Sequence, residues 1–483
     1  MTYLTDRIDI IFDYIESKRD YLENNYELFD IYSGNLKPYV EKIMIESLSE
    51  NYFKKVKSRI MPVNILKRLI DKLSKCYSTA PIRESSNMQE FIDHYVEEFN
   101  LDLSMNTADE FSNLFKGYAL EPYVKDGKSC LRVLPYDRFL VYSDDPSNPL
   151  NVTVFIKIMG KKLIKNYKNG SLESRTIYYL YTNDEFLAID SKKEIYSPAM
   201  QDNQGINPYG IIPIYYANRS KYSILPIQDT DLSAMVKLIP TMLSDLGGAI
   251  MFQCFSIIYG IDINFEDLTF SPNSLWSFKS DKVSQKEPKI GTIKPEANIG
   301  EVMSFIKEAL AIWIESRGIK AGSVGSIDAQ NFASGIAKII DEMDTYELRK
   351  VAIQSFKVEE FEFFKMLQVM HNYWVQTGKI LNQRQYVGDL EFSIEYDEPV
   401  PYQTKTEQLD SIERELKLGT MDFETAIKEL HPDWSEEKIE ELVAAKQKPI
   451  EIKVSEDGMA ASGDTNTKGS ETETTRSDSV GSY

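Results

Sequence analysis

A run of 42 residues, 336–377, contains neither proline nor glycine, and it constrains the fold more than any other feature of the chain. A continuous helix of that length would extend for about 60 Å. Because a single compact domain rarely contains such a helix, we expect an elongated subunit built around it. The preceding segment, 318–335, holds four glycines and three serines, which predicts a flexible loop between two helices.

The first 225 residues divide by the period of their apolar positions. Residues 1–115 show helical spacing, most clearly in segments 3–15, 38–49, 65–77 and 88–99. Residues 116–225 instead hold short β-branched and aromatic runs, which predict a meandering antiparallel sheet. These runs are 129–134, 139–142, 152–158, 176–181 and 186–190. The expected fold class is therefore α+β and mainly helical.

Two further helices are predicted on either side of a small insert. The first spans 229–259, with Thr230 or Asp231 as the expected N-cap and Pro240 as an expected kink. The second helix spans 299–317 and is expected to end at a glycine, residue 318.

The C-terminal part of the chain contains only short predicted elements. A strand is expected over 390–396, and two or three short helices are expected over 404–446. From Ser455 onward the residues are mostly Ser, Thr, Gly, Asp and Glu, which predicts a disordered tail because so few apolar side chains cannot form a core.

The balance of charge and the rarity of cysteine and histidine exclude several classes of protein. The chain has 75 acidic and 55 basic residues, a formal net charge of −20, which argues against a broad basic surface that grips nucleic acid. Nucleic acid that slides past without sticking remains compatible with this charge. Three cysteines without a CxxC pair and three histidines argue against a disulfide framework, a structural zinc site or a His-dependent triad. The N-terminus predicts an amphipathic helix rather than a signal peptide, and the most apolar segment, 249–261, is too short to span a bilayer, so we expect a soluble protein.

Motifs for common chemistries do not occur in the sequence. It contains no GxxxxGK[ST], no GxGxxG after a strand, no HExxH and no GxSxG. The acidic residues of the long helix and of the short helical segment near 436 are predicted to lie on solvated helix faces rather than in a metal site. His371 is predicted to pack between helices. The acidic residues concerned are Glu359, Glu360, Glu362, Glu436 and Glu437, and also Asp341, Glu342 and Asp344. We therefore predict no catalytic residue, no metal site and no cofactor, and expect a non-enzymatic subunit of an assembly.

Five short motifs follow one another along the chain, and their order indicates a particular family. They are a helix ending in Tyr-x-x-x-Pro within 59–81, a hairpin and strand of the type P-x-x-F-x-V-Y within 117–144, an N-x-x-G-x-I-P strand within 207–218, S-G-x-A within 332–338, and a short helix over 418–430. The spacing in the second motif differs slightly. Together with the order of predicted elements, these motifs resemble the portal proteins of tailed bacteriophages over about residues 5–445.

The resemblance implies a division of the chain into named regions. Residues 1–228 would form a wing of helices and an antiparallel sheet, 229–259 and 299–317 the two stem helices, and 260–298 a small clip between them. Residues 318–335 would be the tunnel loop, 336–402 the long helix with a wing strand, 403–454 a helical crown, and 455–483 the tail.

The resemblance also implies function and partners. Portal proteins form a ring, usually of twelve subunits, at one capsid vertex, through which double-stranded DNA passes without sequence specificity. The expected partners are further copies of the chain, the terminase motor, an adaptor or head-completion protein, and the major capsid or scaffolding protein. No membrane is involved, and the ring would be assembled in the host cytoplasm and belong to the virion.

Candidate site residues follow from this division. The tunnel loop would present small or polar side chains to DNA, with hinges at Gly318 and Gly335; the residues are Lys320, Ser323, Ser326, Asp328, Gln330 and Asn331. The clip would carry the docking surface for the motor or adaptor, with candidates Phe270, Trp276, Phe278, Lys279 and Lys282. Lys286 and Arg317 are further basic candidates for the channel. For each basic candidate taken singly, an ordinary solvated side chain is the favoured interpretation.

Two other classes remain open. One is another ring-forming virion component, such as a connector or a minor capsid protein, and such proteins are generally shorter and lack so long a helix. The other is a metal-dependent nuclease whose acidic ligands are brought together only by folding.

Overall fold

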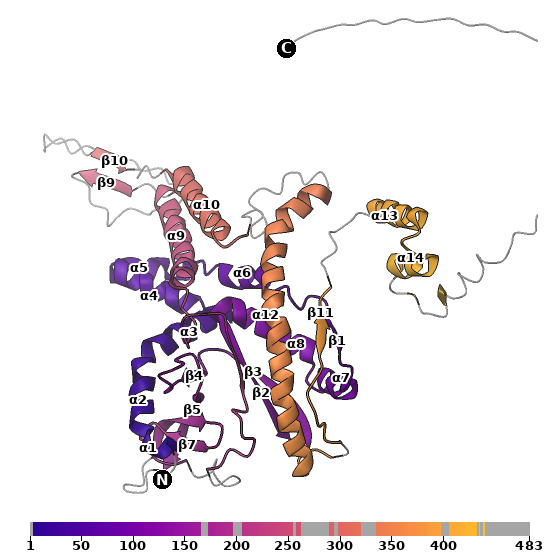
Figure 1. Ribbon diagram of the computed structural model, residues 1–483. Coiled ribbons are helices and arrows are strands. Elements are labelled where there is room, and N and C mark those ends of the chain that lie inside the picture. The colour runs from indigo at the N-terminus through magenta and orange to yellow at the C-terminus, as the bar shows by residue number, and fades with distance from the viewer. Residues whose placement is uncertain are drawn as a thin grey trace, which may run out of the picture. The chain divides into compact units, whose positions relative to one another are not determined.

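The computed structural model describes residues 3–165, 172–196, 205–254, 257–261, 289–293, 298–319, 335–381, 383–397, 405–431, 434, 438 and 439. The chain forms two compact units, Met1–Tyr402 and Gln403–Tyr483, which are described separately. The expected α+β class with a helical majority is confirmed (Figure 1). Among the described residues, no helix is both long and apolar enough to cross a membrane.

Helices make up the N-terminal part of the first unit. They are α1 (Tyr3–Asp6), α2 (Ile8–Ser17), α3 (Arg19–Tyr32), α4 (Lys37–Ser47), α5 (Glu50–Val56), a 3₁₀ turn (Lys57–Arg59), α6 (Ile65–Leu73), α7 (Gln89–Glu98) and α8 (Leu101–Phe115). Helical structure up to residue 115 was predicted, but α3 and α8 lie outside the segments with the clearest spacing. Tertiary packing supports these two helices, since Leu28 of α3 and Met105 of α8 are both in the core.

The strands form two larger antiparallel sheets rather than one meander. The first has the order β3-β2-β8, from β2 (Gly117–Lys125), β3 (Lys128–Leu134) and β8 (Tyr215–Asn218). The second has the order β4-β5-β6-β7, from β4 (Phe139–Tyr142), β5 (Val154–Lys165), β6 (Leu172–Tyr181) and β7 (Phe186–Asp190). The prediction of a single sheet was therefore wrong. Strand β2 is absent from the runs found by periodicity, because its first six residues are all buried and it lacks the alternation of a half-exposed strand; the 117–144 motif did imply a hairpin here, and β2 pairs with β3.

Two antiparallel helices follow the sheets. Helix α9 (Thr230–Cys254) continues through Pro240, and α10 (Ile299–Glu315) packs on it through Ile239, Leu246 and Ile306. The expected N-cap was wrong: the amide of Leu232 donates to Asp229 Oδ1 at 3.0 Å, so Asp229 caps α9. Between the two helices, β9 (Ile257–Ile261) and β10 (Lys289–Ile293) pair as an antiparallel hairpin.

The long helix is present at its predicted length. Helix α12 spans Gly335–Gln376, 42 residues. Beyond it, β11 (Ser393–Glu395) confirms the predicted strand in shortened form and pairs with β1 (Ile82–Glu84). This pairing joins segments some 300 residues apart, and sequence periodicity carries no information on such a partner.

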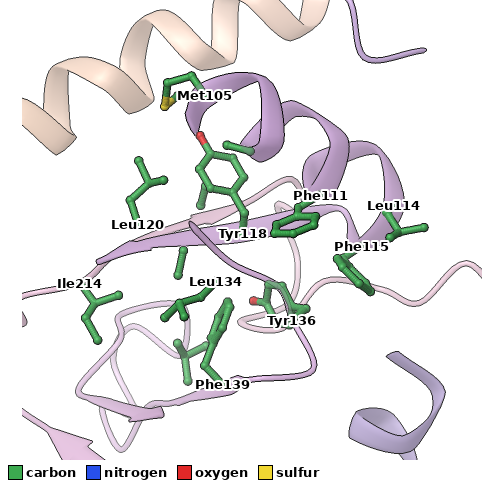
Figure 2. Packing of buried hydrophobic residues seen from close by; sticks show 14 of the residues in the cluster. Met105, Phe111, Leu114, Phe115, Tyr118, Leu120, Leu134, Tyr136, Phe139 and Ile214 are labelled. Atoms are coloured by element: carbon green, nitrogen blue, oxygen red, sulfur yellow. The ribbon is translucent and has the colours of Figure 1, made fainter. Parts of the chain in front are cut away.

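One apolar core joins the helices, both larger sheets and α12. It includes Leu28 of α3, Tyr118 of β2 and Phe363 of α12. Figure 2 shows Met105 and Tyr118 on one side of β2 and Phe139 on the other. The Phe139 and Phe155 rings stack with centroids 5.1 Å apart, which ties β4 to β5.

The second unit is a pair of helices in its described part. Helix α13 spans Lys405–Leu418 and α14 spans Phe423–Leu430. The amide of Thr425 donates to Asp422 Oδ1 at 2.9 Å, which caps α14. The predicted short helix within 418–430 is therefore confirmed.

Candidate functional site

Most of the candidate residues lie outside the described residues. These are the loop residues Lys320, Ser323, Ser326, Asp328, Gln330 and Asn331, the clip residues Phe270, Trp276, Phe278, Lys279 and Lys282, and also Lys286. The tail from Ser455 and the side chains of Asp341, Glu342 and Asp344 lie outside them too, as do Glu436 and Glu437. The described residues instead show how the ends of these segments are held.

The two candidate hinges flank the loop segment. Gly318 follows α10 in the left-handed conformation, with φ of +72°, which confirms its predicted place after the helix end. A Cβ at this position would lie 3.1 Å from Leu348 Cδ1 of α12, so a side chain would be both strained and crowded. Gly335 is the first residue of α12. Their role as hinges stays a prediction.

A cluster of charged side chains fastens the end of α10 to the start of α9. The Arg317 guanidinium lies 2.5 Å from Asp229 Oδ2 and 2.9 Å from Asp231 Oδ2. Trp313 Nε1 also donates to Asp231 Oδ2 at 2.9 Å. Burial by itself would raise the pKa of Asp229, but the hydrogen bonds from Arg317 and from the Leu232 amide outweigh it and hold the pKa below its usual range.

This cluster has two consequences for the site. Arg317 was a candidate basic residue for the channel; its charge is balanced by two carboxylates and its side chain is only 16% exposed, and its place in a channel stays a prediction. The end of α10 lies at the start of α9, so the β9–β10 hairpin, which joins their other ends, must lie at the far end of the helix pair (Figure 1).

The acidic pair in the middle of α12 is buried, which corrects its assignment to a solvated face. Glu360 is 0% exposed and accepts hydrogen bonds from Arg83 Nε at 2.7 Å and from the Tyr77 hydroxyl at 2.6 Å. Glu359 accepts a hydrogen bond from the Tyr118 hydroxyl at 2.8 Å and pairs with Arg219. The apolar residues of α12 are spread around most of its circumference, so its sequence does not show which face packs against the rest of the unit.

The electrostatics of this pair follow from burial. Burial raises the pKa of Glu359 above its usual range, although the Arg219 charge and the Tyr118 hydroxyl act in the opposite direction. Glu362, one helical turn from the pair, has a side chain that is 49% exposed, and for this residue the predicted solvated face is confirmed. The buried pair is a structural connection of α12 to β1 through Arg83 and to β2 through Tyr118.

The remaining candidate groups also have packing roles. His371 is fully buried, with Nδ1 2.8 Å from the Tyr95 hydroxyl and Nε2 2.8 Å from the Arg384 carbonyl oxygen, so its predicted packing role is confirmed. Burial lowers its pKa. Cys76 and Cys130 are free thiols. Within the described part of the chain, no group of three or more His, Cys, Asp or Glu side chains is placed to hold a metal ion.

No family model matches the chain, and no curated protein matches it. The order and packing of the chain's own elements are therefore the basis for inferring its function.

Proposed function

We propose that the chain is a portal subunit, which forms a ring at one capsid vertex and passes double-stranded DNA through a central channel. The observation that carries the proposal is the order of elements between α9 and β11. Along the chain, the β9–β10 hairpin lies between the two antiparallel helices α9 and α10. A glycine-rich segment follows, and then the 42-residue helix α12 leads to β11, which pairs with β1 of the N-terminal part. In the proposal, α9 and α10 are the stem, the β9–β10 hairpin is the base of the clip, and 318–335 is the tunnel loop.

The charge of the chain suits this function. Twelve copies at −20 each would carry about −240. Acidic groups along a channel repel phosphate at short range, so DNA passes without being held. The Arg317 cluster contributes to this picture, because it leaves no free arginine at the point where α10 ends.

The partners follow from the proposed regions. The clip, 260–298, would dock the terminase motor during packaging and the adaptor afterwards. A scan that replaces Lys and Asp residues of this insert should leave ring formation intact and weaken the binding of motor or adaptor. Unchanged binding across the whole insert would show that docking occurs elsewhere.

The mass of the purified protein in solution tests the proposal. A ring of twelve chains of 55.6 kDa has a mass of about 670 kDa and a central hole that averaged electron micrographs would show. A monomer would contradict the proposal, and a monomer that cuts DNA when a divalent metal is added would favour the nuclease. A smaller ring that binds no terminase would favour another connector of the virion.

A further inference from the structure

A pocket opens in the first unit where β2 meets the C-terminal part of α12. Its volume is about 430 Å³, and it lies among β2, the ends of β6 and β7, the segment 207–214, and Met370 and Trp374 of α12. Pockets of roughly 300–1,000 Å³ are typical of ligand sites. Strand β8 pairs with β2 only as far as Leu120, and the pocket begins at the next residue, Glu121.

The walls of the pocket are aromatic and rigidly held. Five aromatic side chains line it: Tyr123, Tyr181, Phe186, Tyr209 and Trp374. Trp374 Nε1 donates to the Tyr209 hydroxyl at 2.9 Å. The side-chain Nδ2 of Asn207 donates to the carbonyl oxygens of Thr182 at 2.6 Å and Ile211 at 2.7 Å, which holds the 207–211 turn in place. A guest would therefore meet walls that are already ordered, which lowers the entropic cost of binding.

Two charged side chains line the pocket, Glu121 and Lys379, and they differ in their partners. Its one carboxylate, Glu121, is 8% exposed and already engaged by Lys157 Nζ at 2.6 Å and Arg132 Nη1 at 3.0 Å. Lys379 also lines the pocket, is exposed, and makes no ion pair with any residue that the structure describes; its ammonium lies 5.5 Å from the centroid of the Tyr373 ring. The charge of Glu121 is therefore balanced by Arg132 and Lys157. No carboxylate among the described residues forms an ion pair with Lys379.

This arrangement decides between two kinds of guest. Aromatic boxes with a free carboxylate bind cations. Here the carboxylate is paired twice and a further ammonium group stands beside the rings, so a cation would be repelled. An aromatic or other flat apolar group that carries negative charge beside it satisfies both the walls and Lys379.

We propose that this pocket binds an acidic, extended segment of a partner protein that inserts one aromatic side chain among the rings. The acidic neighbours of that side chain would lie against Lys379, and the segment would run along β2 beyond the point where β8 leaves it. The site is separate from the segments proposed for DNA and motor contact, so it stands or fails independently of the portal proposal.

Calorimetric titration of the full chain with three tripeptides tests the proposal. The probes are acetyl-Asp-Trp-Asp-amide, acetyl-Asp-Ala-Asp-amide and acetyl-Lys-Trp-Lys-amide. The first should bind one per chain, and its affinity should fall as salt is raised. The second and third should bind at least about tenfold more weakly, because each lacks one of the two required features. Equal binding of the first two peptides, tighter binding of the third, or no binding of the first would each overturn the proposal.

Variants locate the binding. Lys379→Glu should weaken the acidic tryptophan peptide about tenfold or more. Val124→Trp, at a half-buried lining residue, should fill the pocket and abolish binding. Lys221→Glu, an equal charge change at an exposed position that does not line the pocket, is the matched control and should bind as the parent does. Parent-like binding by both Lys379→Glu and Val124→Trp, with unchanged melting temperatures, would place the peptide elsewhere and contradict the site.

Discussion

Arg83 on β1 and Glu360 in the middle of α12 are 277 residues apart in sequence and form a buried ion pair, with Arg83 Nε 2.7 Å from Glu360 Oε2. Both side chains are at most 3% exposed. The pair joins the long helix to a strand that itself pairs with β11, so one contact ties the N-terminal helices, α12 and the segment after it. Breaking one partner of such a pair leaves a charge that neither water nor a counter-ion stabilises fully.

Removal of the Glu360 charge should therefore be strongly destabilising. We expect Glu360→Gln to lower the free energy of unfolding by about 3 kcal/mol, because Arg83 stays buried with only Asp102 as its acidic partner. Glu362→Gln, at a half-exposed position on the same helix, is the control and should change it by less than about 0.5 kcal/mol. Urea unfolding measures the free energy of unfolding of both variants. Equal effects would mean that the buried ion pair stabilises the fold no more than the half-exposed Glu362 does.

Asp137 should make stability depend on pH in an unusual direction. Both of its carboxylate oxygens are buried without a hydrogen-bond partner among the described residues, although Arg138 Nε lies 3.2 Å from Oδ2 as an ion pair. Burial raises the pKa of Asp137 to about 6, and the Arg138 charge acts against this. The folded state then binds this proton more tightly than the unfolded state, so the contribution of Asp137 falls as pH rises from about 4 to about 6.

The Asp137→Asn variant isolates that contribution. Its stability relative to the parent should improve by about 2 kcal/mol between pH 4 and pH 7, which is most of the free energy of a shift of about two pKa units. The comparison uses the change with pH, so any constant cost of the new amide cancels. A difference that stays the same over this range would show that Asp137 is ionised normally in the folded protein.

Gly318 should tolerate a side chain less well than Gly378. Both glycines have left-handed φ values, +72° and +67°, but only Gly318 has a neighbour, Leu348 Cδ1, within contact distance of the missing Cβ. We expect Gly378→Ala to cost about 1 kcal/mol from backbone strain and Gly318→Ala up to about 2 kcal/mol. Thermal unfolding of the two variants compares them, and a smaller effect at Gly318 would mean that Leu348 moves aside freely.

Stiffening the start of α12 should separate assembly from packaging. The portal proposal expects Gly335→Val to form normal rings, because the ring contacts would lie in the stem and wing, but to package less DNA per capsid, because a β-branched residue restricts the backbone where the loop joins the helix. Ring formation and packaged DNA are measured side by side. Normal packaging with this variant would assign the loop a passive connecting role.

The C-terminal tail should be dispensable for assembly. From Ser455 the sequence holds few apolar residues, and its acidic residues outnumber Lys468 and Arg476. A chain truncated after Val454 should give rings of the same diameter as the full chain in electron micrographs. Loss of the ring on truncation would identify the tail as an arm that connects subunits.

The sequence by itself determined the elements that depend on local rules. The absence of proline and glycine over 336–377 predicted α12, Gly318 marked the end of α10, and the run of aromatic and β-branched residues within 139–142 coincides with β4. Helix continuity and strand propensity are properties of neighbouring residues. It also led to the correct packing role for His371, whose neighbours on the helix are apolar and aromatic.

Only the tertiary structure decided which residues far apart in the chain meet. The burial of Glu359 and Glu360 depends on Arg219 and Arg83, which lie in other elements, so helical position alone made these glutamates look like a solvated face. The division into two sheets, the pairing of β1 with β11 and the aromatic pocket likewise depend on long-range packing. Burial and charge pairing are properties of the neighbours in space, and a single sequence specifies those neighbours only through the complete fold.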